Sequence, residues 1–152
     1  MSTVIEDALP ILDEARGLLD EFGFNSYDVV MRLVEWSGAR IGEGDPTKTD
    51  TTLTLDGSHR INVERLTGHD IMASGGLYSE GDWRVGPLTP AYPGGGRDAS
   101  YFNPTSSQPF EIFYKLTGPG FESGQWFRKI DQKVDGNFGL FFTIRAENVT
   151  DP

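Results

Sequence analysis

The sequence predicts a mainly β protein, an antiparallel β-sandwich or barrel with one N-terminal amphipathic helix and a long Gly/Pro-rich loop. The chain has 152 residues, which is the size of one domain, so residues 1–152 are expected to form a single unit. Its 19 Gly, 9 Pro and 12% aromatic residues favour short strands and turns over a helical bundle. About seven strand-like segments follow one another in the expected β core, residues 27–147.

The first element is expected to be a helix over residues 7–22. Its apolar residues recur at the spacing of one helical stripe: Ile11, Leu12, Ala15, Leu18, Leu19 and Phe22. Asp7 is a good N-cap, Pro10 lies in the first turn, and Gly23 is a fitting stop. The stripe predicts that this helix packs on the sheet.

Three further segments are predicted to be strands. Residues 26–38 are β-branched and alternate only partly, so that strand is expected to be covered on both faces. Residues 82–86 form a short strand, and residues 109–118 place an apolar face made of Phe110, Ile112, Tyr114 and Leu116. Residues 39–50 are interpreted as a polar Gly/Pro loop.

Residues 51–66 are interpreted as a hairpin. A two-residue turn at Asp56–Gly57 would scramble the apolar and polar faces. A three-residue loop at 56–58 instead pairs Leu53 with Ile61, which brings apolar residues together. The three-residue loop is therefore preferred.

A second hairpin is expected over residues 125–147, with a three-residue loop at 135–137. This loop pairs Val134 with Phe138, Ile130 with Phe142 and Arg128 with Ile144. The two hairpins complete the antiparallel core.

Composition excludes several classes of function. No cysteine is present, so disulfides, thiolate nucleophiles, thiolate zinc sites and iron–sulfur clusters are excluded. The net charge of −10, with no basic cluster, disfavours direct binding of nucleic acid. Neither a signal peptide nor an apolar run of membrane-spanning length is present, so a soluble protein with no membrane contact is expected.

No catalytic or metal-binding pattern is found. His59 and His69 are the only histidines and belong to no metal motif; His69 is expected in a short helical turn. Ser58 and His59 are adjacent and so point to opposite strand faces, and no GxSxG elbow occurs. Gly94–Gly96 are not followed by a helix pattern, as a phosphate-binding loop would require. We therefore expect no enzymatic activity, no cofactor and no metal.

The extended loop 86–108 is interpreted as a contact arm. Prolines favour extension there and Gly94–Gly96 supply a hinge. Large aromatic side chains in or beside this loop are the candidates for subunit contacts: Trp83, Tyr92, Tyr101 and Phe102. An ordered loop folded over its own sheet remains the alternative.

Three stretches carry a resemblance to a known class of proteins: "SGGLYSEGDWRVGPLTP" at 74–90, "KLTGPG" at 115–120 and "WFRKID" at 126–131. In these stretches the sequence resembles small virion structural proteins of tailed bacteriophages, of the head and head–tail joining type. The resemblance covers roughly residues 29–131.

The resemblance implies a neck, or head-completion, subunit that acts in the virion after assembly in the host cytoplasm. The implied partners are copies of itself in a ring, with portal or adaptor proteins on one side and the tail on the other. It carries over no catalytic residues. Capsid decoration and tail subunits remain alternatives, as does a glycan-binding β-sandwich module that would stack sugars on Trp83, Tyr92 or Tyr101.

Overall fold

The computed structural model describes residues 27–54, 61–88, 99–135 and 139–152. The strands are β1 (Asp28–Trp36), β2 (Pro46–Thr52), β3 (Val63–Arg65), β4 (Trp83–Leu88), β5 (Phe110–Gly118), β6 (Phe121–Asp135) and β7 (Gly139–Ala146), and the helices are α2 (Gly68–Ala73) and α3 (Ala99–Phe102). The predicted helix 7–22 and its packing lie outside the described residues. Within those residues, no helix has the length and apolar character needed to cross a bilayer.

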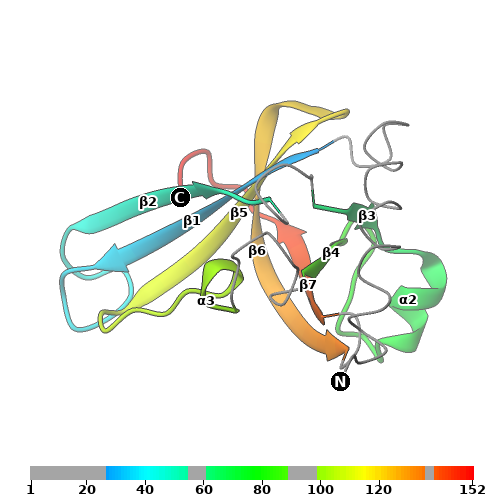
Figure 1. The fold of residues 1–152 in the computed structure, drawn as a ribbon, viewed down its shortest axis with the longest axis horizontal. Helices are drawn as coiled ribbons and strands as arrows, with labels where there is room; N and C mark the ends of the chain where they lie inside the picture. The colour runs from blue at the N-terminus through cyan, green and yellow to red at the C-terminus, as the bar shows by residue number, and fades with distance from the viewer. Residues whose placement is uncertain (1–26, 55–60, 89–98, 136–138) are drawn as a thin grey trace, which may run out of the picture.

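The seven strands form one antiparallel sheet in the order β2-β1-β5-β6-β7-β4-β3 (Figure 1). The expectation of a mainly β, antiparallel protein is therefore confirmed. The expected sandwich or barrel is not what forms in the described residues, because β2 and β3 are the two free edges of a single open sheet. Bending at irregular positions in β4, β5 and β6 lets this one sheet enclose a core.

The main core lies on one face of the sheet. Among the described residues it contains thirteen buried ones from six of the strands and the segments beside them: Val29, Met31, Leu53, Ile61, Val63, Val85, Phe102, Tyr114, Leu116, Phe127, Leu140, Phe142 and Ile144. A second, small cluster of Val34, Phe113 and Trp126 lies on the other face. As predicted, β1 is thus covered on both faces: Val29 and Met31 are buried in the main core, and Val34 is buried in the small cluster on the other face.

The sheet has two parts. We call residues 32–52 with residues 110–112 the wing, because they extend away from the rest of the sheet (Figure 1). The other part, which we call the body, contains β6, β7, β4 and β3 together with α2. Every residue of β2 is exposed or only half-buried, so the wing has little cover of its own.

The predicted hairpin over residues 51–66 is wrong. β2 pairs with β1, and β3 pairs with β4, so Leu53 and Ile61 belong to segments at opposite edges of the sheet. The interpretation of residues 39–50 as a loop is correct for residues 39–45 and wrong for residues 46–50, which belong to β2. The three-residue loop proposed at 56–58 lies outside the described residues.

The C-terminal hairpin forms, but in a different register. Val134 pairs with Leu140 and Gln132 with Phe142, whereas the prediction paired Val134 with Phe138. Lys129 pairs with Ile144, and the register shifts between Lys129 and Asp131. The difference begins at the turn, because Asp135 already pairs with Gly139. Matching apolar faces could not decide between the two registers, since Val134 meets an apolar residue in both.

A groove at the fork of the sheet

The tip of the wing is a tightly hydrogen-bonded loop between β1 and β2. The Ser37 amide donates to the carbonyl of Asp45 at 3.2 Å, and the Gly38 amide donates to the carbonyl of Glu43 at 2.8 Å. The Asp45 amide returns a hydrogen bond to the hydroxyl of Ser37 at 2.8 Å. The tip therefore has a defined shape although it lies in solvent.

Glycine is required at this tip for steric reasons. Gly44 has a φ of +82°, and a Cβ there would lie 2.3 Å from the Ser37 hydroxyl oxygen. The compact loop places Ile41 in solvent, with 55% of its surface exposed. A large apolar side chain held outward on a preorganised loop is typical of a contact residue.

Beside the wing, β5 and β6 separate from one another. Their pairing ends at Phe113 and Arg128, after which β5 continues with β1 into the wing and β6 continues with β7 into the body (Figure 1). Between the two diverging strands lies a groove of about 450 Å³, which we call the fork groove. It is lined by Ile41, Asn103, Pro104, Thr105, Phe110, Glu111, Ile112, Arg128 and Lys129.

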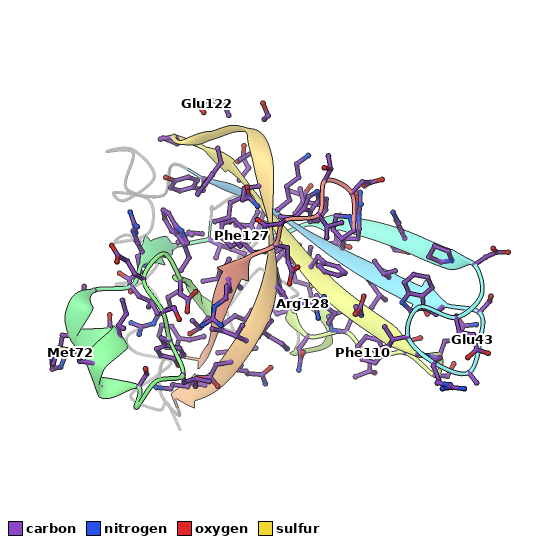
Figure 2. The ribbon with its side chains drawn as sticks, turned by 180° about the vertical axis from the view of Figure 1, so that it is seen from behind. Glu43, Met72, Phe110, Glu122, Phe127 and Arg128 are labelled. Atoms are coloured by element: carbon purple, nitrogen blue, oxygen red, sulfur yellow. The ribbon has the colours of Figure 1, made fainter. Side chains whose placement is uncertain are left out.

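The lining of the fork groove combines an apolar wall with positive charge. Phe110 comes from the wing side of the fork and Arg128 from the point where the strands part (Figure 2). The Arg128 guanidinium is engaged by Glu147 at 2.7 Å and Glu111 at 3.8 Å. The second cation, Lys129, has a different environment.

The ammonium group of Lys129 contacts only neutral groups among the described residues. Its Nζ donates to the amide oxygens of Asn103 and Gln132, both at 3.1 Å, and lies 4.9 Å from the ring centre of Phe142. Burial lowers the pKa of Lys129, because desolvation disfavours the charged form. A carboxylate placed in the groove would favour the charged form and complete this site.

The opposite face of the wing is occupied by the C-terminal residues. Arg32 donates to Asp50 at 2.8 Å, pairs with Asp151, and lies 4.3 Å from the ring centre of Trp126. Hydrogen bonding to Arg32 lowers the pKa of both Asp50 and Asp151. Because these residues hold the end of the chain over that face, the fork groove is on the open side of the wing.

Three of the four predicted contact residues pack within the chain. Phe102 is 0% exposed and belongs to the main core, so its predicted role as a contact anchor is wrong. Tyr101 packs beside it, and its hydroxyl donates to the carbonyl of Thr52 at 2.8 Å. Trp83 is half-buried and packs edge-on against Tyr27, with the two ring centres 5.3 Å apart. Tyr92 lies outside the described residues.

The contact-arm interpretation also fails for residues 99–108. Helix α3 carries Phe102 into the core, and the Ser106 hydroxyl donates to Glu35 at 2.6 Å. The Trp36 amide donates to the carbonyl of Pro109 at 2.9 Å. Residues 99–108 therefore pack on the sheet of their own chain. Residues 89–98 lie outside the described residues.

Sequence reasoning missed the fork groove because its residues come from four separate segments. Phe110 and Ile112 were assigned to the apolar face of their strand, which is correct, but nothing in the sequence indicated that part of this face is open. The available signal for the tip was the isolated Ile41 in the polar stretch "SGARIGEGD". The predicted short helix at His69 is confirmed as α2, and His69 is exposed.

Within the described ranges, no three His, Cys, Asp or Glu side chains gather in a way that could hold a metal ion. No protein-family model, curated protein or solved structure matches this chain.

Proposed function

We propose that the chain is a structural subunit of a tailed-bacteriophage particle that forms a ring at the neck through contacts between its loops. The observation that carries the proposal is the wing, a projecting and preorganised element with Ile41 at its tip and an open groove along its side. The phage context comes from the resemblance of residues 74–90, 115–120 and 126–131. Projecting loops of this kind suit contacts to neighbouring subunits.

The distribution of exposed apolar side chains supports association of copies head to tail. Ile41 lies at the wing tip, whereas Met72 and Leu77 are 85% and 49% exposed and belong to α2 and the segment after it. Met72 and the tip residue Glu43 lie at opposite ends of the molecule (Figure 2). Contacts between unlike ends are heterologous, and a heterologous contact that closes gives a ring.

The edge strand β2 favours contacts through the tip over pairing along the edge. Its sequence, PTKTDTT, carries Lys48, Asp50 and an N-terminal proline, which are features that protect an edge from indiscriminate strand addition. The strand is exposed on both faces and offers no apolar surface to a neighbouring sheet. The specific contact surfaces are therefore the tip and the groove.

Deletion of the gene in the source phage tests the proposal. For a neck subunit, electron microscopy of the lysate is expected to show complete heads and complete tails that are not joined. Expression of the protein from a plasmid should restore joined particles, and Ile41→Asp should restore them less well than Arg40→Gln at the same tip.

Joined particles in the deletion lysate would favour a decoration role, and missing tails would favour a tail subunit. Absence of the protein from purified virions, by mass spectrometry, would contradict the proposal entirely.

A further inference from the structure

The chemistry of the fork groove selects for a ligand with both apolar and acidic groups. Its lining offers the apolar side chains of Ile41, Pro104, Phe110 and Ile112. It also contains the ion pair of Glu111 with Arg128 and the half-buried Lys129, whose contacts among the described residues are amide oxygens and the ring of Phe142. A carboxylate next to apolar side chains would satisfy the cation and cover the wall together.

One stretch of this chain outside the described residues has that chemistry. Residues 3–22 combine the predicted apolar stripe with six acidic residues, Glu6, Asp7, Asp13, Glu14, Asp20 and Glu21, against the single basic residue Arg16. The other undescribed stretches, 55–60, 89–98 and 136–138, lack a comparable surplus of acidic residues. Charge complementarity therefore singles out the N-terminal segment.

We infer that the fork groove binds the N-terminal segment, residues 3–22, of a second copy of the chain. The inference rests on the proposed ring, because it names the contact that joins adjacent subunits. The predicted helix lays its apolar stripe against the groove wall, as amphipathic helices do in peptide-binding grooves. The acidic residues that flank the stripe, Glu14 and Glu21, then lie toward Lys129 and the exposed side of Arg128.

The acceptor is assigned to a neighbour because the proposed ring requires contacts between copies. Tyr27 precedes β1 at the end where Asp28 pairs with Thr117, and its hydroxyl donates to the carbonyl of Pro119 at 2.7 Å. Ile112, in the groove, pairs with Leu33, about 17 Å further along β1 at 3.3–3.4 Å per residue. β1 thus begins at the end of the strand away from the wing tip, and a head-to-tail ring brings unlike ends of neighbouring copies together.

The absence of cysteine from the sequence makes disulfide trapping a clean test. One full-length variant carries Thr105→Cys on the exposed rim of the groove, and a second, tagged variant carries Ala15→Cys in the helical stripe. Mixing the two under mild oxidation is expected to give a disulfide-linked heterodimer that contains both chains. A matched mixture replaces Thr105→Cys by Glu122→Cys, an exposed position at the β5–β6 turn, and should give little heterodimer.

The role of Lys129 is tested in the same assay. Lys129→Gln should lower the yield of heterodimer at least about fivefold, since a half-buried cation facing carboxylates is lost. Lys133→Gln, at an exposed position of the same strand and outside the groove, should leave the yield unchanged. Circular dichroism and urea unfolding of both variants would show that each remains folded.

Two results would overturn the inference. One is a heterodimer yield no higher than that of the Glu122→Cys mixture. The other is a chain carrying both Thr105→Cys and Ala15→Cys that closes only an internal disulfide, which would mean that the groove holds its own segment. Either result would leave the neck assignment standing if the protein is still found in virions and its deletion still leaves heads and tails unjoined.

Discussion

The body and the wing of this sheet share strands but are built in different ways. In the part of the chain that the structure describes, the main core has thirteen buried residues, whereas the cluster under the wing has three. Burial of apolar surface contributes about 25 cal/mol per Å², so most of the free energy of folding comes from the body side. The wing keeps its shape through local hydrogen bonds and glycine conformations at its tip. Most of the buried core and the projecting loop thus belong to separate parts of one sheet.

Charged residues follow the same division. In the body, Arg145 donates to both carboxylate oxygens of the buried Asp82, at 3.0 and 2.9 Å, and to the carbonyl of Leu77 at 3.1 Å. These bonds fix the segment between α2 and β4. In the wing, the carboxylates that pair with Arg32 are largely exposed, so the pairs are open to screening by salt.

The largest expected effect comes from a matched pair of core substitutions. Phe142→Ala removes a fully buried ring from the main core and should lower the free energy of unfolding by about 4–5 kcal/mol. Phe113→Ala in the small cluster should cost less, about 3 kcal/mol or below, because a thinly covered site can collapse around the missing ring. Urea unfolding measures both, and equal losses would mean that the wing is as firmly packed as the body.

A second pair of substitutions tests whether the tip is preorganised. Gly44 has a positive φ, and the methyl group of an alanine there would lie 2.7 Å from the Gly38 amide nitrogen. Gly44→Ala should therefore lower the stability of the tip by about 2–3 kcal/mol. Gly42 has a similar φ of +86°, but no atom lies within 4 Å of the methyl group that alanine would add. Gly42→Ala should therefore lower the stability of the tip by only about 1 kcal/mol. Hydrogen exchange of the tip amides should increase more in the Gly44 variant. Similar exchange in the two variants would show that the tip is not tightly packed.

The division between body and wing also explains which strands the sequence could reveal. β1, β4, β5 and β7 were located because their apolar residues recur at strand spacing and face a core. β6 was located as the first arm of the predicted hairpin at 125–147. β2 was missed because an edge strand exposed on both faces has no apolar alternation, and its threonines were the only signal. The turn-like residues at 56–58 were interpreted as a tight hairpin, although the strands on either side pair with other partners.

The candidate site was less predictable than the fold. The contact residues were sought among loop aromatics, but Phe102 completes the core and Trp83 packs on Tyr27. The fork groove depends on where β5 and β6 part, and this position follows from the bulges and from the pairing of β6 with β7. Such long-range geometry leaves no local pattern in the sequence.

A smaller effect is expected from the buried hydroxyl of Tyr114. The side chain is 0% exposed, and its hydroxyl has no hydrogen-bond partner within the described part of the chain. Burial raises the pKa of this hydroxyl, which stays neutral. Tyr114→Phe removes an unsatisfied polar group and should increase stability by about 1 kcal/mol, measured by urea unfolding. A loss of stability would instead reveal a hydrogen bond to this hydroxyl.

The smallest effect concerns the charges that hold the C-terminal residues over the wing. Because the pKa values of Asp50 and Asp151 are lowered in the folded protein, the stability they contribute is present above their unfolded pKa of about 3.9 and is lost as the pH falls through the folded values. Arg32→Gln removes the shared partner, so its unfolding midpoint should lie below that of the wild type near neutral pH and approach it in acid. Arg40→Gln, at a mostly exposed pair with Glu43, should show almost no such pH-dependent difference. The difference for Arg32→Gln should also shrink in high salt, since Asp50 and Asp151 are exposed. A difference that persists in acid would mean that Arg32 stabilises the wing chiefly through its packing on Trp126.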